Sequence, residues 1–228
     1  MISMLQRVEL IAFDLDNTLY DEGTYFDAAF EQIAPVLAQE STMSVSAIRG
    51  RLSEILSENG KHYHQLFTDL LADLGLPADI HLPEVLQIYC TVPARLELSP
   101  GARELLRDLS ERYRLAMITG GMEVAQRNKI DLLGLQETFE HIVYSSSLSE
   151  NKPGKEPFNR LLHLTGVSAG TAAYVGDNPM SDFRGANELG MITIRVPNPE
   201  FNGYEAQPGL DGRIRVTSLE ELRPLFLQ

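Results

Sequence analysis

Two aspartates follow a strongly apolar segment near the start of the chain. The segment Val8–Leu15 is almost continuously apolar until it reaches Asp14, and Asp16 stands two residues further on. Residues two apart in extended backbone project to the same side, so both carboxylates are expected at the mouth of a buried strand. Like charges brought together in this way require a cation. Asp177 and Asp182, further along the chain, supply more hard oxygen ligands, and carboxylates of this kind suit Mg²⁺ better than zinc or copper.

Polar residues follow three other apolar segments in the same manner. The second segment ends at Thr119 and Gly120, the third is followed by Lys152, and the fourth runs into Asp177, with Asp182 five residues later. One aspartate at such a place is better interpreted as a cap of a turn or a helix start. Four aspartates at two strand ends, beside a threonine and a lysine, favour a catalytic site instead.

The apolar segments alternate with amphipathic stretches, and this alternation predicts an α/β fold with a Rossmann-like parallel sheet. The predicted strands are Val8–Leu15, Leu115–Thr119, Ile142–Ser145, Ala172–Gly176, Ile192–Val196 and Ile214–Thr217. The predicted helices are Gly101–Tyr113, Met122–Leu133, Pro157–Leu164 and Ser181–Leu189, several of them followed by a glycine. Ligands of such sheets bind beyond the carboxyl ends of the strands, where the polar residues stand.

The segment from Asp21 to Arg95 breaks this alternation. Its apolar residues recur at helical spacing in three groups, which are Phe26, Phe30, Ile33 and Leu37, then Val45, Ile48, Leu52 and Ile55, then Phe67, Leu70, Leu71 and Leu74. Three or four helices without a convincing strand predict a small helical domain, residues 21–95, inserted after the first strand. Residues 1–20 and 96–228 then form the core domain. The stretch Pro197–Arg213 is predicted to be a long surface loop because it is rich in Pro, Gly and Asn.

The composition of the 228 residues, 43% hydrophobic and 22% charged, is that of a globular protein. A formal net charge of −13 argues against a nucleic-acid or anionic-membrane partner, although a small anion can enter a locally positive pocket. No stretch reaches the roughly 20 apolar residues of a spanning helix, and Met1–Arg7 lacks the layout of a secretion signal. We therefore expect a cytoplasmic location. Cys90 is the only cysteine, so no intramolecular disulfide is possible, and we expect it to pack as a small hydrophobe.

The four polar groups match, in order and spacing, the four motifs of the haloacid dehalogenase superfamily, and almost the whole chain resembles a member of that group. The first motif corresponds to Phe13-Asp14-Leu15-Asp16-Asn17-Thr18-Leu19. The resemblance implies that Asp14 is the nucleophile and Asp16 the general acid and base. It also implies that Thr119, Gly120 and Lys152 bind the phosphoryl oxygens.

The same resemblance implies a magnesium cofactor held by Asp14, by the backbone carbonyl of Asp16 and by Asp177. Asp182 is expected in a second layer around the metal or to reach it through water. The chain departs from the common pattern at Gly120, where many relatives carry asparagine. Lys155 competes with Lys152 for the third motif, but the spacing from Lys152-Pro153 to Phe158 matches the family and favours Lys152.

These assignments predict magnesium-dependent hydrolysis of a small phosphate monoester, a nucleotide, sugar or other metabolite phosphate, through an aspartyl-phosphate. A 2-haloacid dehalogenase is the nearest alternative, but release of a halide needs no acid, so Asp16 argues for phosphoryl transfer. A phosphosugar mutase remains compatible with the motifs. A non-catalytic binding protein is disfavoured because nucleophile, acid, lysine and metal ligands are all intact. A monomer and a homodimer both remain open.

The family resemblance also implies that the helical insertion is a cap that closes over the site and selects the substrate. Candidates to reach the leaving group are Tyr20, Tyr25, Lys61, His62 and His64. The alternative interpretation, that each is an exposed polar residue, is equally well supported by the sequence.

Overall fold

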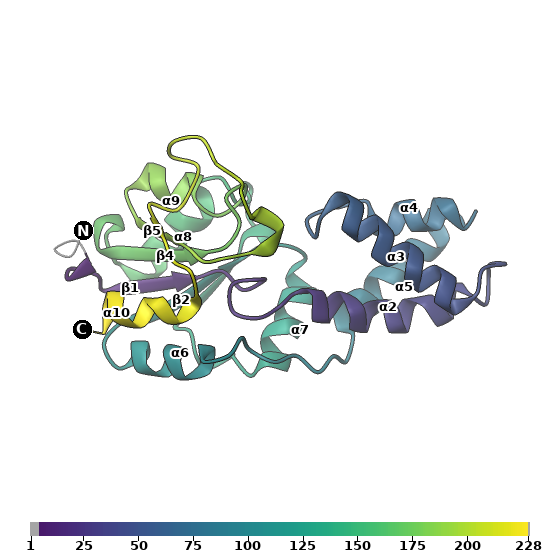
Figure 1. The fold of residues 1–228 in the computed structure, drawn as a ribbon, viewed down its shortest axis with the longest axis horizontal. Helices are drawn as coiled ribbons and strands as arrows, with labels where there is room; N and C mark the ends of the chain where they lie inside the picture. The colour runs from purple at the N-terminus through teal and green to yellow at the C-terminus, as the bar shows by residue number, and fades with distance from the viewer. Residues whose placement is uncertain (1–4, 228) are drawn as a thin grey trace. The chain divides into compact units, whose positions relative to one another are not determined.

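The computed structural model describes residues 5–227, which divide into two compact units. The first unit contains the residues up to Glu22 together with those from Leu96 onward, and the second contains Gly23–Arg95. In Figure 1 the second unit is the group of helices labelled α2 to α5.

The first unit is built on a six-stranded sheet, and all of its strand pairs are parallel. Its strands are β1 (Leu10–Phe13), β2 (Arg114–Thr119), β3 (His141–Tyr144), β4 (Ala172–Gly176), β5 (Ile192–Arg195) and β6 (Ile214–Arg215), in the order β3-β2-β1-β4-β5-β6. Every residue of β1 and β4 is buried, which explains why these segments are continuously apolar rather than alternating. The predicted α/β class with a parallel Rossmann-like sheet is confirmed.

Helices flank this sheet on both sides (Figure 1). They are α6 (Ala102–Ser110), α7 (Glu123–Leu133), α8 (Glu156–Thr165), α9 (Arg184–Leu189) and α10 (Leu222–Phe226). One face of the sheet is covered by α8 and α9, whose Phe158, Leu161 and Ala186 share a core with Leu10 and Ile118. Helices α7, α8 and α9 each end at a glycine in the left-handed conformation, as the sequence predicts.

The register of the sheet determines which loops meet. Phe13 at the end of β1 pairs with Met117 of β2 on one side and with Val175 of β4 on the other. Because the strands are parallel, the residues that follow all three strands emerge at the same edge. The chain segments after Phe13, after Ile118 and after Val175 are therefore neighbours.

The second unit is entirely helical and consists of α2 (Gly23–Leu37), α3 (Val45–Asn59), α4 (Leu66–Asp73) and α5 (Ala78–Thr91). Ser44 caps the start of α3, where its hydroxyl accepts a hydrogen bond from the amide of Ala47, and Gly60 caps the end of the helix. The ring of Tyr89 packs against the rings of Tyr25, Phe26 and Phe67 with centroid distances of 5.4, 5.8 and 5.4 Å. This unit therefore has an apolar core of its own, as the helical spacing of its apolar residues predicts.

None of the helices within residues 5–227 has both the length and the apolar character that crossing a membrane requires.

Candidate active site

The carboxyl edge of the sheet gathers four of the predicted site residues. Asp14 directly follows β1, Thr119 ends β2, Lys152 lies in the loop after β3, and Asp177 directly follows β4. All four side chains are buried, and Nζ of Lys152 lies 2.5 Å from Oδ1 of Asp14. Residues separated by up to 163 positions in the chain thus form one polar cluster in an apolar surrounding.

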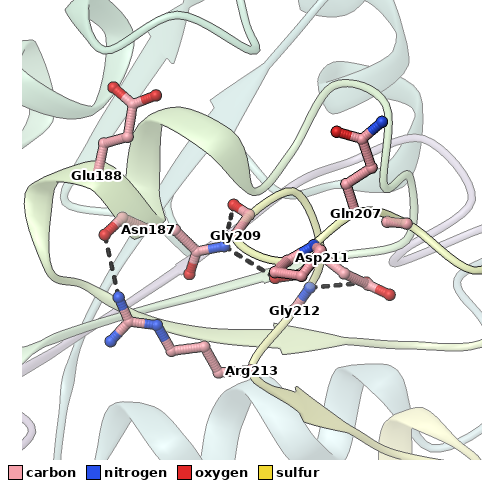
Figure 2. A pocket seen from close by; sticks show the side chains of 9 residues that line it. Asn187, Glu188, Gln207, Gly209, Asp211, Gly212 and Arg213 are labelled. Carbon is pink, nitrogen blue, oxygen red and sulfur yellow. Dashed lines mark hydrogen bonds between the residues drawn. The ribbon is translucent and has the colours of Figure 1, made fainter.

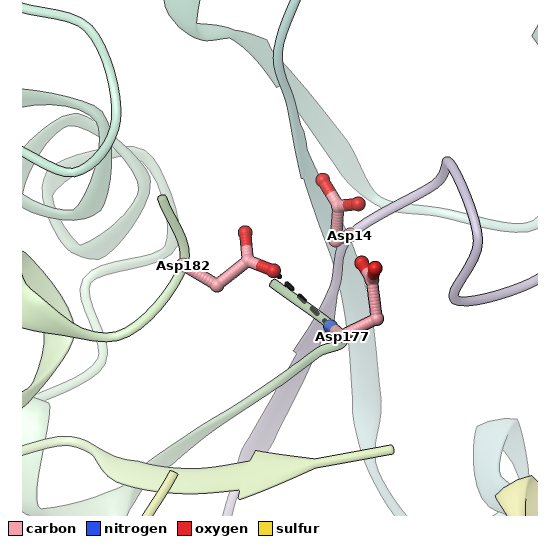
Figure 3. Close-up of side chains that lie close together, drawn as sticks. All are labelled: Asp14, Asp177 and Asp182. Carbon is pink, nitrogen blue, oxygen red and sulfur yellow. Dashed lines mark hydrogen bonds between the residues drawn. The ribbon is translucent and has the colours of Figure 1, made fainter. Parts of the chain in front are cut away.

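Three carboxylates converge within this cluster. Asp14, Asp177 and Asp182 each contribute an oxygen, and these oxygens all lie within 4.8 Å of one another (Figure 3). Burial raises the pKa of Asp14 well above its usual range, Lys152 opposes this rise, and the neighbouring aspartates add to it. Burial and the charge of Asp182 also raise the pKa of Asp177, to about 7. Buried hard oxygen ligands that repel one another are a donor set that fits a divalent cation such as Mg²⁺.

Asp182 already has donors on both of its carboxylate oxygens. Oδ1 accepts hydrogen bonds from Nζ of Lys152 at 2.8 Å and from the Tyr174 hydroxyl at 3.1 Å. Oδ2 accepts the backbone N–H of Asp177 at 3.1 Å, the bond drawn in Figure 3, and the next amide at 2.9 Å. The side chain therefore shapes the turn after β4 and orients Lys152. A Cβ at Gly176 would lie 2.5 Å from this same oxygen, so a larger residue here would displace Asp182 from its present position.

Of the two lysines considered for the third motif, only Lys152 lies in the cluster. Burial lowers the pKa of its ammonium group, but Asp14 and Asp182 outweigh this effect and raise the pKa well above its usual value. Lys152 is therefore charged at neutral pH. Lys155 instead forms a half-exposed ion pair with Glu188 at 2.8 Å.

The side chain of Asp16 has a separate set of partners. Its Oδ1 accepts hydrogen bonds from Nζ of Lys129 at 2.8 Å and from the Tyr20 hydroxyl at 2.6 Å, and its Oδ2 accepts one from Nε2 of Gln126 at 2.7 Å. Burial by itself raises the pKa of Asp16, but the charge of Lys129 and the hydrogen bonds lower it below the usual value. Asp16 is thus held as a carboxylate, the form that can accept a proton.

Gln126 and Lys129 were not among the residues singled out from the sequence. Both lie on α7, where they are buried together with the apolar residues Ala125, Ile130 and Leu133. A glutamine and a lysine on the apolar face of a predicted helix are the signal that could have identified them, because such groups are buried only when they have partners.

Two further side chains orient Asp177. Nδ2 of Asn198 donates a hydrogen bond to its Oδ2 at 2.6 Å, and the hydroxyl of Thr18 donates one to its Oδ1 at 3.2 Å. Asn198 belongs to the stretch predicted to be a surface loop. That prediction is wrong for Asn198 and Phe201, which are both buried, because the start of the loop returns over the strand ends.

The hydroxyl of Thr119 and the backbone of Gly120 lie at the end of β2. The hydroxyl oxygen of Thr119 accepts a hydrogen bond of 2.5 Å from Nε2 of Gln126. At Gly120 a Cβ would meet only Cε of Lys152 at 3.8 Å and Oγ of Ser145 at 3.9 Å, which are ordinary contacts. The backbone of Gly120 therefore faces the cluster without a side chain of its own.

The residues proposed to reach the leaving group have different surroundings. Tyr20 is buried in the first unit, where it binds Asp16. Tyr25 belongs to the second unit, where its hydroxyl donates a hydrogen bond of 2.6 Å to the carbonyl oxygen of Tyr89. Tyr20 thus contacts a candidate site residue, whereas the hydroxyl of Tyr25 binds the backbone of its own unit.

A cavity of about 440 Å³ lies apart from the aspartates, between α9 and the loop before β6 (Figure 2). Its polar groups bind one another, since Nδ2 of Asn187 donates to the carbonyl oxygens of Gly209 and Asp211 at 2.9 and 2.8 Å. Arg213 donates to the carbonyl oxygen of Asn187 at 3.0 Å. These bonds fasten the loop to α9, and we assign the cavity no part in the chemistry.

We expect magnesium to raise the Tm of the protein more at about pH 8 than at about pH 5. In the metal-free folded state Asp177 keeps its proton up to about pH 7, whereas the unfolded chain releases it near 3.8. The folded state therefore binds more protons between these values, and the free energy of unfolding falls by up to about 1.4 kcal/mol for each pH unit. Above pH 7 the ionised carboxylates bind the metal without displacing a proton.

Thermal unfolding with and without Mg²⁺ at the two pH values measures this difference. Asp177→Asn is the control, because it removes both a charge and the titrating group. A magnesium effect that is equal at both pH values, or larger in acid, would contradict the expectation.

Comparison with known proteins assigns the chain to a family. Residues 11–196 match the family model of the haloacid dehalogenase-like (HAD) hydrolases. Glyceraldehyde 3-phosphate phosphatase of Pyrococcus abyssi is 33% identical over 82% of this chain and 80% of its own, and human N-acylneuraminate-9-phosphatase is 27% identical over 82% and 81%. The HAD-hydrolase YfnB of Bacillus subtilis shares the fold, with a TM-score of 0.72 and 23% identity over 96% of this chain and 99% of its own. The predicted resemblance is therefore confirmed, and the chain belongs to the haloacid dehalogenase-like hydrolases.

Proposed function

We propose that the protein hydrolyses a small phosphate monoester in a magnesium-dependent reaction that passes through an aspartyl-phosphate on Asp14. The phosphatases among its relatives support phosphatase activity for this chain. The observation that carries the proposal is the position of Asp14, buried at the end of β1 between the ammonium of Lys152 and the carboxylates of Asp177 and Asp182.

The first chemical step belongs to Asp14 and Asp16. An oxygen of Asp14 attacks phosphorus, the bond from phosphorus to the ester oxygen breaks, and Asp16 gives a proton to the leaving alkoxide. Asp16 must take up this proton before the step, because Lys129 holds it as a carboxylate in the free protein. Lys152, the Thr119 hydroxyl and the amide of Gly120 bind the equatorial oxygens, where negative charge accumulates.

The second step regenerates the enzyme. Asp16, now a carboxylate, takes a proton from a water molecule that attacks the aspartyl-phosphate, and inorganic phosphate leaves as Asp14 is released. The ionised state in which Lys129 holds Asp16 suits this step. Asp14, Asp177 and the backbone carbonyl of Asp16 would hold magnesium, which would supply positive charge beside the phosphoryl group.

The relatives favour a sugar phosphate as substrate class. Glyceraldehyde 3-phosphate and N-acylneuraminate 9-phosphate, the compounds in the relatives' names, both carry the phosphate on a terminal carbon of a hydroxylated chain. We propose a substrate of this kind over a nucleotide. A haloacid dehalogenase is the weaker candidate, because three donors hold the carboxylate of Asp16 in place although release of a halide has no use for it.

A turnover screen tests the function. The purified protein is offered glyceraldehyde 3-phosphate, hexose phosphates, nucleoside monophosphates, p-nitrophenyl phosphate and 2-chloropropionate, each with Mg²⁺ and with excess chelator. We expect release of inorganic phosphate that stops on chelation and returns with Mg²⁺. Full phosphatase activity in excess chelator, or release of chloride without metal, would overturn the proposal.

A further inference from the structure

Lys129 of α7 is one of the largest fully buried side chains in the protein, and no motif accounts for it. Its side chain is 1% exposed, and Nζ lies 2.8 Å from Oδ1 of Asp16 and 3.1 Å from Oε1 of Glu22. Burying an ammonium group costs several kcal/mol unless its partners compensate for the lost water. The carboxylates of Asp16 and Glu22 provide that compensation.

The contacts of Asp16 show what Lys129 does for it. Each oxygen of the Asp16 carboxylate has a donor, with Lys129 and Tyr20 on Oδ1 and Gln126 on Oδ2. Together these bonds restrict rotation about both side-chain torsions. Only Lys129 among these donors carries charge, and charge-assisted hydrogen bonds are roughly twice as strong as neutral ones.

Helix α7 links this carboxylate to the predicted phosphoryl-binding hydroxyl. Gln126 stands three residues before Lys129, so both side chains leave the same face of the helix. Its Nε2 donates to Oδ2 of Asp16 and also to the Thr119 hydroxyl oxygen. One helical face therefore sets the distance between the proton-transfer group and the phosphoryl-binding group.

Glu22 supports Lys129 from the opposite side. It is buried, and its Oε2 accepts a hydrogen bond of 3.3 Å from Nδ2 of Asn17, while its own amide donates to Oδ1 of Asn17 at 3.2 Å. Asn17 has a left-handed backbone with φ of 57°. The hydrogen bonds between Asn17 and Glu22 thus stabilise the loop that carries Asp16, and Lys129 forms ion pairs with both Glu22 and Asp16.

We propose that Lys129 is a positioning residue for proton transfer, seated on Glu22 so that its ammonium group holds the carboxylate of Asp16 at a fixed place and orientation. The proposal rests on the function proposed above, because it assumes that Asp16 moves a proton. Lys129 acts through Asp16 and does not touch the phosphoryl group. Its loss should therefore impair proton transfer to the leaving group and leave the binding of phosphate largely intact.

The test compares two substrates on Lys129→Met, a change that keeps the length of the side chain and removes its charge. We expect kcat/KM for glyceraldehyde 3-phosphate to fall about 10- to 100-fold with little change in KM, the loss typical of residues that orient a reacting group. For p-nitrophenyl phosphate, whose leaving group departs without a proton, the fall in kcat/KM should be much smaller. Equal losses for both substrates would overturn the proposal, since a purely structural role affects both alike.

A double-mutant cycle with Asp16→Asn gives an independent readout. If Lys129 acts through Asp16, Lys129→Met costs no further activity once Asp16 is changed. Additive losses would contradict this. If Lys129→Met does not fold, the carboxylate of Glu22 has lost its partner, and the double variant Lys129→Met with Glu22→Gln removes that charge. The kcat/KM values of the double variant are then measured with the same two substrates.

Lys155→Met is the matched control, because it makes the same change at a half-exposed lysine outside the cluster, and its ratio of the two kcat/KM values should stay near that of the unmodified protein. Failure of this inference is distinguishable from failure of the proposed function. If the unmodified protein releases no phosphate with Mg²⁺, the function is wrong. If it does, and Lys129→Met affects both substrates equally, only the role of Lys129 is wrong.

Discussion

Asp14→Asn is expected to reduce kcat by about 10⁴- to 10⁶-fold, the scale of loss seen when a covalent nucleophile is removed. The neutral amide oxygen of asparagine is a poor nucleophile, and Asp182 cannot take its place at phosphorus, because both oxygens of Asp182 already bind donors. The fold should survive. Lys152 keeps its contact with Asp182 at 2.8 Å, and removing a buried carboxylate relieves its repulsion with Asp177.

Steady-state phosphate release and thermal unfolding of the same preparation measure these two effects. We expect the Tm of the metal-free variant to equal or exceed that of the unmodified protein. The exposed Asp131→Asn on α7 serves as a control for the substitution itself. Acid quenching during turnover should trap phosphate on the unmodified protein and on the control but not on Asp14→Asn. Turnover near the original rate would remove Asp14 from the nucleophile's role.

Asp16→Asn is expected to lower kcat/KM for glyceraldehyde 3-phosphate by about 10²- to 10⁴-fold, the usual contribution of a general acid. An alkoxide is a poor leaving group, and asparagine has no proton to give it. The side chain is nearly isosteric, and Gln126 can turn its amide to accept a hydrogen bond from the new NH₂ group. The backbone carbonyl proposed to bind magnesium is unchanged.

The same variant assayed with p-nitrophenyl phosphate separates proton transfer from positioning. The p-nitrophenolate ion is stable enough to leave without a proton, so the loss in kcat/KM should be much smaller for this substrate. An equal loss for both substrates would show that Asp16 only positions other groups. That outcome would leave Asp14 as the nucleophile.

Asp14, Thr119 and Asp177 could be singled out from the sequence because each stands at the end of an apolar strand, and the family resemblance implied the roles proposed for Asp14, Asp16 and Lys152. The parallel sheet then follows from the alternation of strands and helices, and its register brings Asp14, Thr119 and Asp177 to one edge. Local chemistry also identified the helix ends, since Gly134, Gly166 and Gly190 take a left-handed conformation that other residues avoid.

The partners of these residues depended on contacts between distant segments. Lys129 and Asp16 are 113 positions apart, and Asn198 reaches Asp177 from a stretch whose composition indicates only a surface loop. No local pattern encodes such pairs. A lysine in a helical sequence is ordinarily solvated, and only packing against two carboxylates makes its burial favourable.

The sequence by itself thus determined the class of fold, the order of the strands' polar ends and the residue types available for phosphoryl transfer, because these depend on periodicity and on spacing along the chain. The tertiary structure decided which of the two lysines contacts Asp14 and which donors bind Asp16. It also decided that the carboxylate of Asp182 accepts hydrogen bonds from Lys152 and from two backbone amides. The orientation and the protonation state of these side chains depend on their burial and on neighbouring charges, and both arise only once the chain has folded.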